Sequence, residues 1–163
     1  MTGLRHERLC YNWPIMSSFA VGVDIIELQR VAAALKRHDG RFLGRVYTPL
    51  EAAVCHGRPS ELAARFAAKE AVMKALGTGA RGVAWREIEV LPNRRGKPLV
   101  YLHGRARERA ARIALDGLDL SLSHSRRYAV AFVVASRNSK EPADREAWRE
   151  KLADIVRERR WLE

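Results

Sequence analysis

Residues 60–79 read SELAARFAAKEAVMKALGTG, and the rest of the chain is best understood outward from them. Ser60 suits a helix N-cap and Gly77 a C-terminal stop, which predicts a helix over residues 61–76. At 100° per residue its large apolar side chains fall on one stripe. The members of this stripe are Leu62, Phe66, Met73 and Leu76.

Glu70 and Lys74 lie at one edge of the stripe. Ala63 and Ala67 on the same edge are too small to block a ligand, so the pair suits a metal-binding carboxylate beside an amine that handles protons or phosphate. The alternative is an i,i+4 Glu-to-Lys ion pair in the favoured orientation, which supports a helix by about 0.2–0.5 kcal/mol. The residues of the helix alone leave both interpretations open.

Upstream, residues 19–26 are apolar and β-branched apart from Asp24, which predicts a short strand that leads into a helix. Asp24 has two interpretations. With Glu27 three positions on, it matches a capping box for the next helix. Alternatively, it is an acid in an apolar run that a hard cation such as a metal ion neutralises, because an unpaired buried charge is expensive.

The other elements follow from periodicity and turn residues. Thr48 and Pro49 open a helix through about Cys55, and a terminal amphipathic helix starts from Pro142. The predicted fold class is α+β: an antiparallel sheet packed against the long helix and shorter helices, plus an extra C-terminal helix. The remaining segments are a short helix at 41–47, strands at 83–91 and 99–102, a helix at 104–114, and a hairpin of 118–124 and 128–135.

The composition indicates one globular domain with an acidic partner. The 163 residues are 47% hydrophobic and carry a net charge of +11, of which residues 1–15 and 137–163 each hold +1. The remaining +9 belongs to residues 16–136, the predicted domain, with 1–15 as a leader and 137–163 as an extension. A charge excess in the folded part points to nucleic acid or an acidic protein.

The sequence also excludes several classes of protein. The longest apolar run, residues 128–135, is far below the roughly 20 residues that a membrane helix needs. The N-terminus has no secretory signal pattern, which predicts a cytoplasmic protein. Cys10 and Cys55 lie far apart, so neither a disulfide framework nor a zinc site follows.

Two turns, at residues 77–79 and 95–98, can bring backbone N–H groups and cations near a phosphate. The turn at residues 95–98, Arg-Gly-Lys-Pro, combines cations with free backbone N–H groups, but it is equally readable as a plain turn. His124 ends the strand of residues 118–123, where a single histidine is more often a structural hydrogen-bonding residue than a catalyst.

Four stretches together resemble one family, the holo-acyl-carrier-protein synthases, which are the small class of 4′-phosphopantetheinyl transferases. The resemblance covers about residues 19–135. It implies transfer of the phosphopantetheine arm of coenzyme A to a serine of an apo carrier protein, for fatty acid or polyketide synthesis, with release of 3′,5′-ADP. The stretches are VGVDIIELQRV at 21–31, RFAAKEAVMKALGTG at 65–79, RGKP at 95–98 and SLSHSRRYAVAFVV at 121–134.

The resemblance also implies roles for individual residues. Asp24 and Glu70 match the family's Mg²⁺ ligands, and we expect Glu70 to take the proton of the attacking serine. Lys74 is expected to stabilise the diphosphate and to protonate the departing phosphate. The expected coenzyme A contacts are Lys74, Gly96, Lys97, Pro98 and His124, and the expected carrier-protein contacts are Arg30, Arg37, Arg41 and Arg45.

The resemblance further implies a homotrimer with active sites at subunit boundaries, because the matched part corresponds to half of the larger two-lobed transferases. The rival hypothesis is a non-enzymatic basic module that binds nucleic acid through phosphate contacts. The sequence has no recognisable motif for binding nucleic acid, and this hypothesis does not explain two acids beside a basic surface. We therefore expect no nucleic-acid partner and no membrane association.

Overall fold

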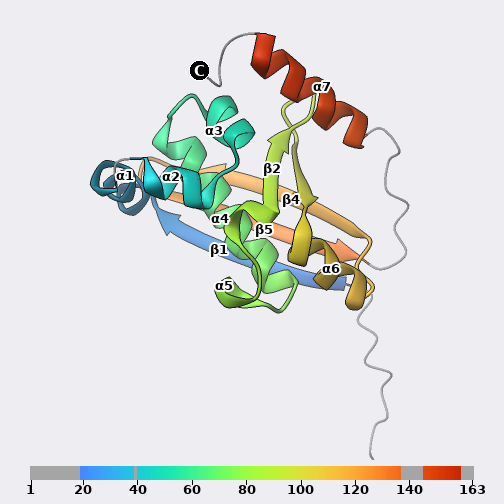
Figure 1. The fold of residues 1–163 in the computed structure, drawn as a ribbon. Coiled ribbons are helices and arrows are strands. Elements are labelled where there is room, and N and C mark those ends of the chain that lie inside the picture. Colours follow the sequence, from blue (N-terminus) through green and yellow to red (C-terminus); the bar gives the residue numbers. More distant parts are fainter. Residues whose placement is uncertain (1–18, 39, 137–144, 159–163) are drawn as a thin grey trace, which may run out of the picture.

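A computed structural model describes residues 19–38, 40–136 and 145–158 (Figure 1). The predicted α+β architecture is confirmed. Strands β1 (Phe19–Glu27), β5 (Tyr128–Ser136) and β4 (Gly117–His124) form an antiparallel sheet in that order. Strands β2 (Ile88–Pro92) and β3 (Pro98–Leu102) form a separate hairpin.

The helices surround one long central helix, α4 (Pro59–Ala75), which packs across β1 and β5 (Figure 1). The sequence predicted that this helix buries one apolar stripe. In the structure α4 is buried on almost every side, so its buried surface is wider than that stripe. Beyond its first turn only Phe66, Glu70 and Lys74 reach solvent. The other helices are α1 (Leu28–Arg37), α2 (Arg41–Val46), α3 (Pro49–Cys55), α5 (Gly79–Gly82), α6 (Gly104–Arg112) and α7 (Arg145–Glu158).

Three local predictions are corrected by tertiary and backbone effects. Helix α4 starts at Pro59 rather than after Ser60, because proline suits the first helical position. Asp24 lies inside β1 and not at a helix start, so its capping-box alternative is wrong. The strand expected over residues 83–91 begins only at Ile88, after a short 3₁₀ turn whose Trp85 ring stacks on Phe66 at 4.6 Å.

The C-terminal extension forms a helix as expected, and α7 covers α3 and the β2–β3 hairpin (Figure 1). Its Leu152 and Val156 are buried against Leu50, Leu91 and Tyr101. The predicted leader at residues 1–15 lies outside the described residues, as do residues 137–144. None of the helices that the structure describes is long and apolar enough to cross a membrane.

Gly22 is the residue that lets α4 approach the sheet. A Cβ added there would lie 1.9 Å from the backbone oxygen of Ala71 and 3.1 Å from the backbone nitrogen of Ala75. Both neighbours belong to the backbone of α4, so no side chain can move aside. The glycine two residues before Asp24 therefore fixes how closely this carboxylate and the helix that carries Glu70 approach each other.

We expect Gly22→Ala to lower stability by about 3 kcal/mol, at the upper end of the usual cost of overpacking, because α4 must move away from β1. Thermal unfolding of the variant measures this loss. Gly44→Ala is the matched control, since a Cβ at Gly44 meets nothing within 4 Å. An unchanged melting temperature in Gly22→Ala would show that the helix–sheet distance is not set by this glycine.

Candidate active site

Asp24 and Lys74 meet where β1 passes under α4. The ammonium of Lys74 donates to Oδ1 of Asp24 at 2.9 Å and to the backbone oxygen of Val23 at 2.7 Å. The Lys74 side chain is 50% exposed and that of Asp24 13% exposed. Lys74 thus bonds to a strand rather than forming the i,i+4 ion pair with Glu70 that helix spacing alone allows. It lies at the solvent edge, where it is free to turn toward a ligand.

Glu70 completes this group. Partial burial and the nearby charge of Asp24 raise its pKa, and the cations Lys74 and Arg30 offset only part of the shift. Two carboxylates held this close repel each other, and a cation between them removes that repulsion. In the described residues no group of three or more His, Cys, Asp or Glu side chains surrounds a common point, so two protein carboxylates are the donor set available here.

These two acids fit Mg²⁺. The ion prefers hard oxygen ligands and usually keeps several waters, with one or two carboxylates and substrate phosphates completing its shell. The donor set of Asp24 and Glu70 has that chemistry, and it lies at the partly exposed edge where a phosphate-bearing substrate has access.

Lys69, one residue before Glu70, has a different environment. Its side chain is fully buried and bonds to Oε2 of Glu51 at 2.7 Å, to the backbone oxygen of Trp85 and to that of Ile88. Glu51 in turn accepts backbone N–H groups of Thr48 and Val90. Burial lowers the pKa of Lys69 and raises that of Glu51, each partly offset by the other. This lysine joins three elements and is out of reach of any substrate.

His124 lies near the start of α4, away from the two acids. Burial of the Glu61 carboxyl acts to raise its pKa, but the hydrogen bond and charge of Arg65, with smaller effects of Arg58 and the nearby His124, hold that pKa below its usual value. Glu61 precedes Glu70 by nine residues, or about 13 Å along the helix axis. The backbone of His124 is paired with Ala129 in the β4–β5 ladder, but its side chain is exposed and makes no hydrogen bond within the described part of the chain. Arg65 is buried and donates to Oε2 of Glu61 at 2.9 Å and to the backbone oxygen of Val90 at 3.2 Å, so it links α4 to β2.

The turn that carries Gly96, Lys97 and Pro98 is placed at the opposite end of β4. The ammonium of Lys97 bonds to Oδ1 of Asp119 at 2.7 Å, and Asp119 lies five residues before His124. At about 3.4 Å per residue this separates the turn from His124 by roughly 17 Å. Within one chain the structure therefore does not bring the expected coenzyme contacts together.

The four arginines expected to bind a carrier protein lie on α1 and α2, beside the acidic pair. All four are exposed, and among the described residues they form no ion pair. Arg30 is close enough to Glu70 to lower its pKa, which places the basic surface directly next to the candidate metal ligands. The four residues are Arg30, Arg37, Arg41 and Arg45.

Comparison with known proteins shows the family of the chain. A model of the 4′-phosphopantetheinyl transferase superfamily matches residues 20–133. The chain belongs to this superfamily. A holo-[acyl-carrier-protein] synthase of Moorella thermoacetica is 46% identical over 123 residues, which cover 74% of this chain and 95% of the relative. One of Herpetosiphon aurantiacus is 48% identical over 120 residues, with 69% and 94% covered.

Solved structures of the family have the same fold. The holo-[acyl-carrier-protein] synthase of Helicobacter pylori in complex with coenzyme A is 32% identical, with a TM-score of 0.66, over 71% of this chain and 99% of that one. The Bacillus anthracis enzyme, solved with coenzyme A (3′,5′-ADP), is 36% identical with a TM-score of 0.60, over 73% and 96%. The predicted family, fold and enzyme class, 4′-phosphopantetheinyl transferase, are confirmed. The comparisons support an enzyme rather than a non-enzymatic binding module.

Proposed function

We propose that this transferase moves the 4′-phosphopantetheine arm of coenzyme A to a serine of an apo-acyl carrier protein of fatty acid or polyketide synthesis, with Mg²⁺ bound by Asp24 and Glu70. The observation that carries the proposal is the convergence of two carboxylates and a half-exposed lysine beside Arg30, which is one of four exposed arginines that form no ion pair with any residue that the structure describes. The relatives are named holo-[acyl-carrier-protein] synthases, which supports the same reaction. The cytoplasmic location stays a prediction.

The bound Mg²⁺ supplies Lewis-acid polarisation and neutralises charge on the diphosphate. The remaining work belongs to the protein. Glu70, whose pKa is raised by partial burial and the charge of Asp24, takes the proton of the serine hydroxyl as the serine oxygen attacks the β-phosphorus. Lys74 leaves Asp24, stabilises the diphosphate charge and donates a proton to the departing 3′,5′-ADP phosphate. Phosphoryl transfer depends mainly on this positioning and charge stabilisation.

Two features of the fold support a homotrimer. The outer face of the β1–β5 sheet is apolar and open, with Val21, Val23, Ile25, Tyr128 and Phe132 between 44% and 64% exposed. Contiguous apolar faces of this kind mark protein interfaces. In addition, the turn at Gly96–Pro98 and His124 lie at opposite ends of β4 in one chain, so a neighbouring subunit that supplies one of them would complete the coenzyme site.

The acidic carrier protein is expected to dock on the α1–α2 arginines. Arg45→Glu should raise the KM for the carrier protein by about tenfold and leave the KM for coenzyme A within twofold, because it reverses charge only at the docking surface. Steady-state kinetics at low and high salt measure both constants, and the effect should shrink with salt. Arg112→Glu, on the distant helix α6, is the matched control. Equal rises in both KM values would contradict the docking assignment.

The reaction is tested by offering fatty-acid, polyketide and peptide-synthetase carrier proteins side by side, with coenzyme A and Mg²⁺. We expect the fatty-acid or polyketide carriers to be modified most efficiently. If none of the carriers is modified, the proposal is wrong.

A further inference from the structure

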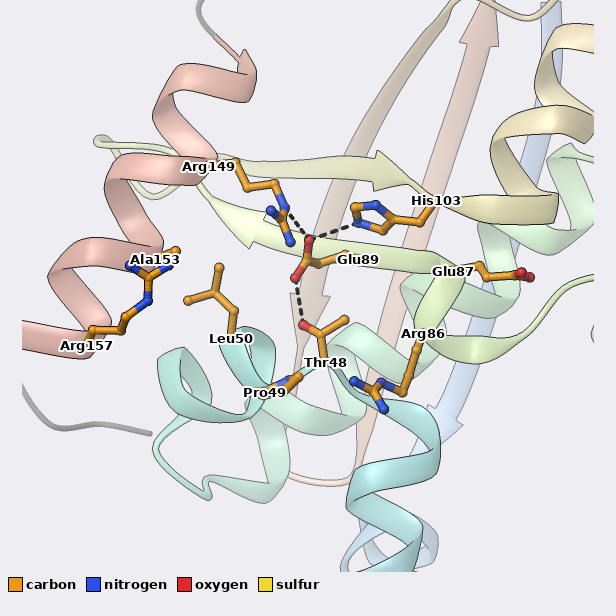
Figure 2. Close-up of a pocket in the computed structure, with 10 residues that line it drawn as sticks. All are labelled: Thr48, Pro49, Leu50, Arg86, Glu87, Glu89, His103, Arg149, Ala153 and Arg157. Carbon is orange, nitrogen blue, oxygen red and sulfur yellow. Dashed lines mark hydrogen bonds and ion pairs between the residues drawn. The ribbon is translucent and has the colours of Figure 1, made fainter. Parts of the chain in front are cut away.

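Helix α7 lies beyond the part of the chain that matches the family, which ends at residue 133. It lines an open pocket of about 520 Å³ together with the start of α3, the 3₁₀ turn before β2 and the β2–β3 hairpin (Figure 2). Glu89 lies at the centre of this pocket and is almost completely buried. Its Oε2 accepts Nε of Arg149 at 2.6 Å and bonds to Nε2 of His103, and its Oε1 accepts the hydroxyl of Thr48 (Figure 2).

Both carboxylate oxygens of Glu89 are therefore bonded to side chains of the protein itself. Burial would raise the pKa of Glu89, but hydrogen bonds from Arg149 and Thr48 hold it below its usual range. Arg157 is likewise bonded to Asp154 of its own helix. The bonds at Glu89 attach α7 to the hairpin, so we assign these contacts a structural role rather than the binding of a separate ligand.

Trp148 carries this attachment to the turn between β2 and β3. Its Nε1 donates to the backbone oxygen of Pro92 at 2.9 Å, and Pro92 is the last residue of β2. The guanidinium of Arg94, inside the turn, lies 5.1 Å from the centre of the Trp148 ring. One side chain of α7 thus contacts both the base and the flank of the turn that presents Gly96, Lys97 and Pro98.

The remaining supports of this turn are local or weak. The side chain of Asn93 accepts the backbone N–H groups of Arg95 and Lys97, which shapes the turn but does not orient it on the protein. The ion pair of Lys97 with Asp119 is 53% and 70% exposed, and exposed pairs contribute little. The turn is otherwise attached through the two strands that it joins, which are paired up to Pro92 and Pro98. Trp148 adds a contact from a separate helix to both the base and the flank of the turn.

We propose that Trp148 is a positioning residue for coenzyme A binding: α7 holds the 93–97 turn in its binding conformation before the coenzyme arrives. The inference rests on the proposed role of this turn in the coenzyme site. A site that is already ordered loses less entropy when its ligand binds, so loosening the turn weakens affinity for coenzyme A specifically.

The experiment compares Trp148→Ala, Trp148→Phe and the wild-type full chain. We expect Trp148→Ala to raise the KM and the calorimetric Kd for coenzyme A by about three- to tenfold, with kcat and the KM for the carrier protein within twofold. Trp148→Phe keeps a ring for Arg94 and loses only the N–H donor, so its effect should be intermediate. Arg157→Gln, which removes the ion pair with Asp154 within α7, is the control and should change neither constant.

Two results would overturn the inference. One is an unchanged affinity for coenzyme A in both Trp148 variants. The other is an equal loss for both substrates that follows the melting temperature, which indicates a purely structural role. If Trp148→Ala does not fold, Trp148→Phe decides, with a two- to threefold rise expected. Failure of the proposed function is recognised separately, because the wild-type protein would then modify no carrier.

Discussion

Glu70→Gln is expected to lower kcat/KM for phosphopantetheine transfer by about a thousandfold or more, with the fold intact. The substitution keeps the volume of the side chain but removes its negative charge and its ability to accept a proton, and each of these is required by the proposed mechanism. Because Asp24 repels the carboxylate of Glu70, neutralising that carboxylate should leave the melting temperature unchanged or slightly raised.

The matched control for this prediction is Glu27→Gln at the exposed end of β1, which should keep wild-type activity. Asp24→Asn should inactivate the enzyme similarly, but it also removes the partner of Lys74. Glu70→Gln is therefore the cleaner variant. A loss of less than tenfold would refute the roles of Glu70 as base and metal ligand.

Lys69→Met is expected to destabilise the protein by about 3–5 kcal/mol, the usual cost of breaking a buried ion pair. The substitution keeps a long unbranched chain but leaves Glu51 charged and unpaired, and it removes the donor for two buried backbone oxygens. Denaturant unfolding at a fixed protein concentration measures the change.

Lys74→Met on the same helix is the matched control for this effect. Its ion pair with Asp24 is half exposed, so its loss should cost less than about 1 kcal/mol of stability while lowering transfer activity strongly. Lys69→Met should therefore mainly lower stability, and Lys74→Met should mainly lower transfer activity. Equal destabilisation by both variants would contradict the structural assignment of Lys69.

Local sequence patterns predicted most of the fold. The Thr48–Pro49 helix start, the stop at Gly77 and the apolar run at residues 128–135 are each patterns within a few residues of the sequence. The predictions were wrong where contacts between residues far apart in the sequence determine the local structure. The 3₁₀ turn before Ile88 exists because Trp85 stacks on Phe66 and Lys69 binds its backbone oxygen, and no local pattern reports either contact.

The candidate site shows the same division. The spacing of Glu70 and Lys74 correctly placed both at the solvent edge of α4, yet it favoured a bond between them that the structure replaces with Asp24. That bond joins residues 50 positions apart, and it depends on the close approach at Gly22. Burial of Lys69 and Glu51 was equally invisible, because each looks like an ordinary surface charge in the sequence.

The most direct test of the account is the mass of an apo-acyl carrier protein after incubation with this enzyme, coenzyme A and Mg²⁺. The account predicts a gain equal to one phosphopantetheine group with the wild-type protein. It predicts no gain after chelation of the metal with EDTA or with Glu70→Gln. Absence of the gain from every carrier tested, or an undiminished gain in EDTA or with Glu70→Gln, would contradict it.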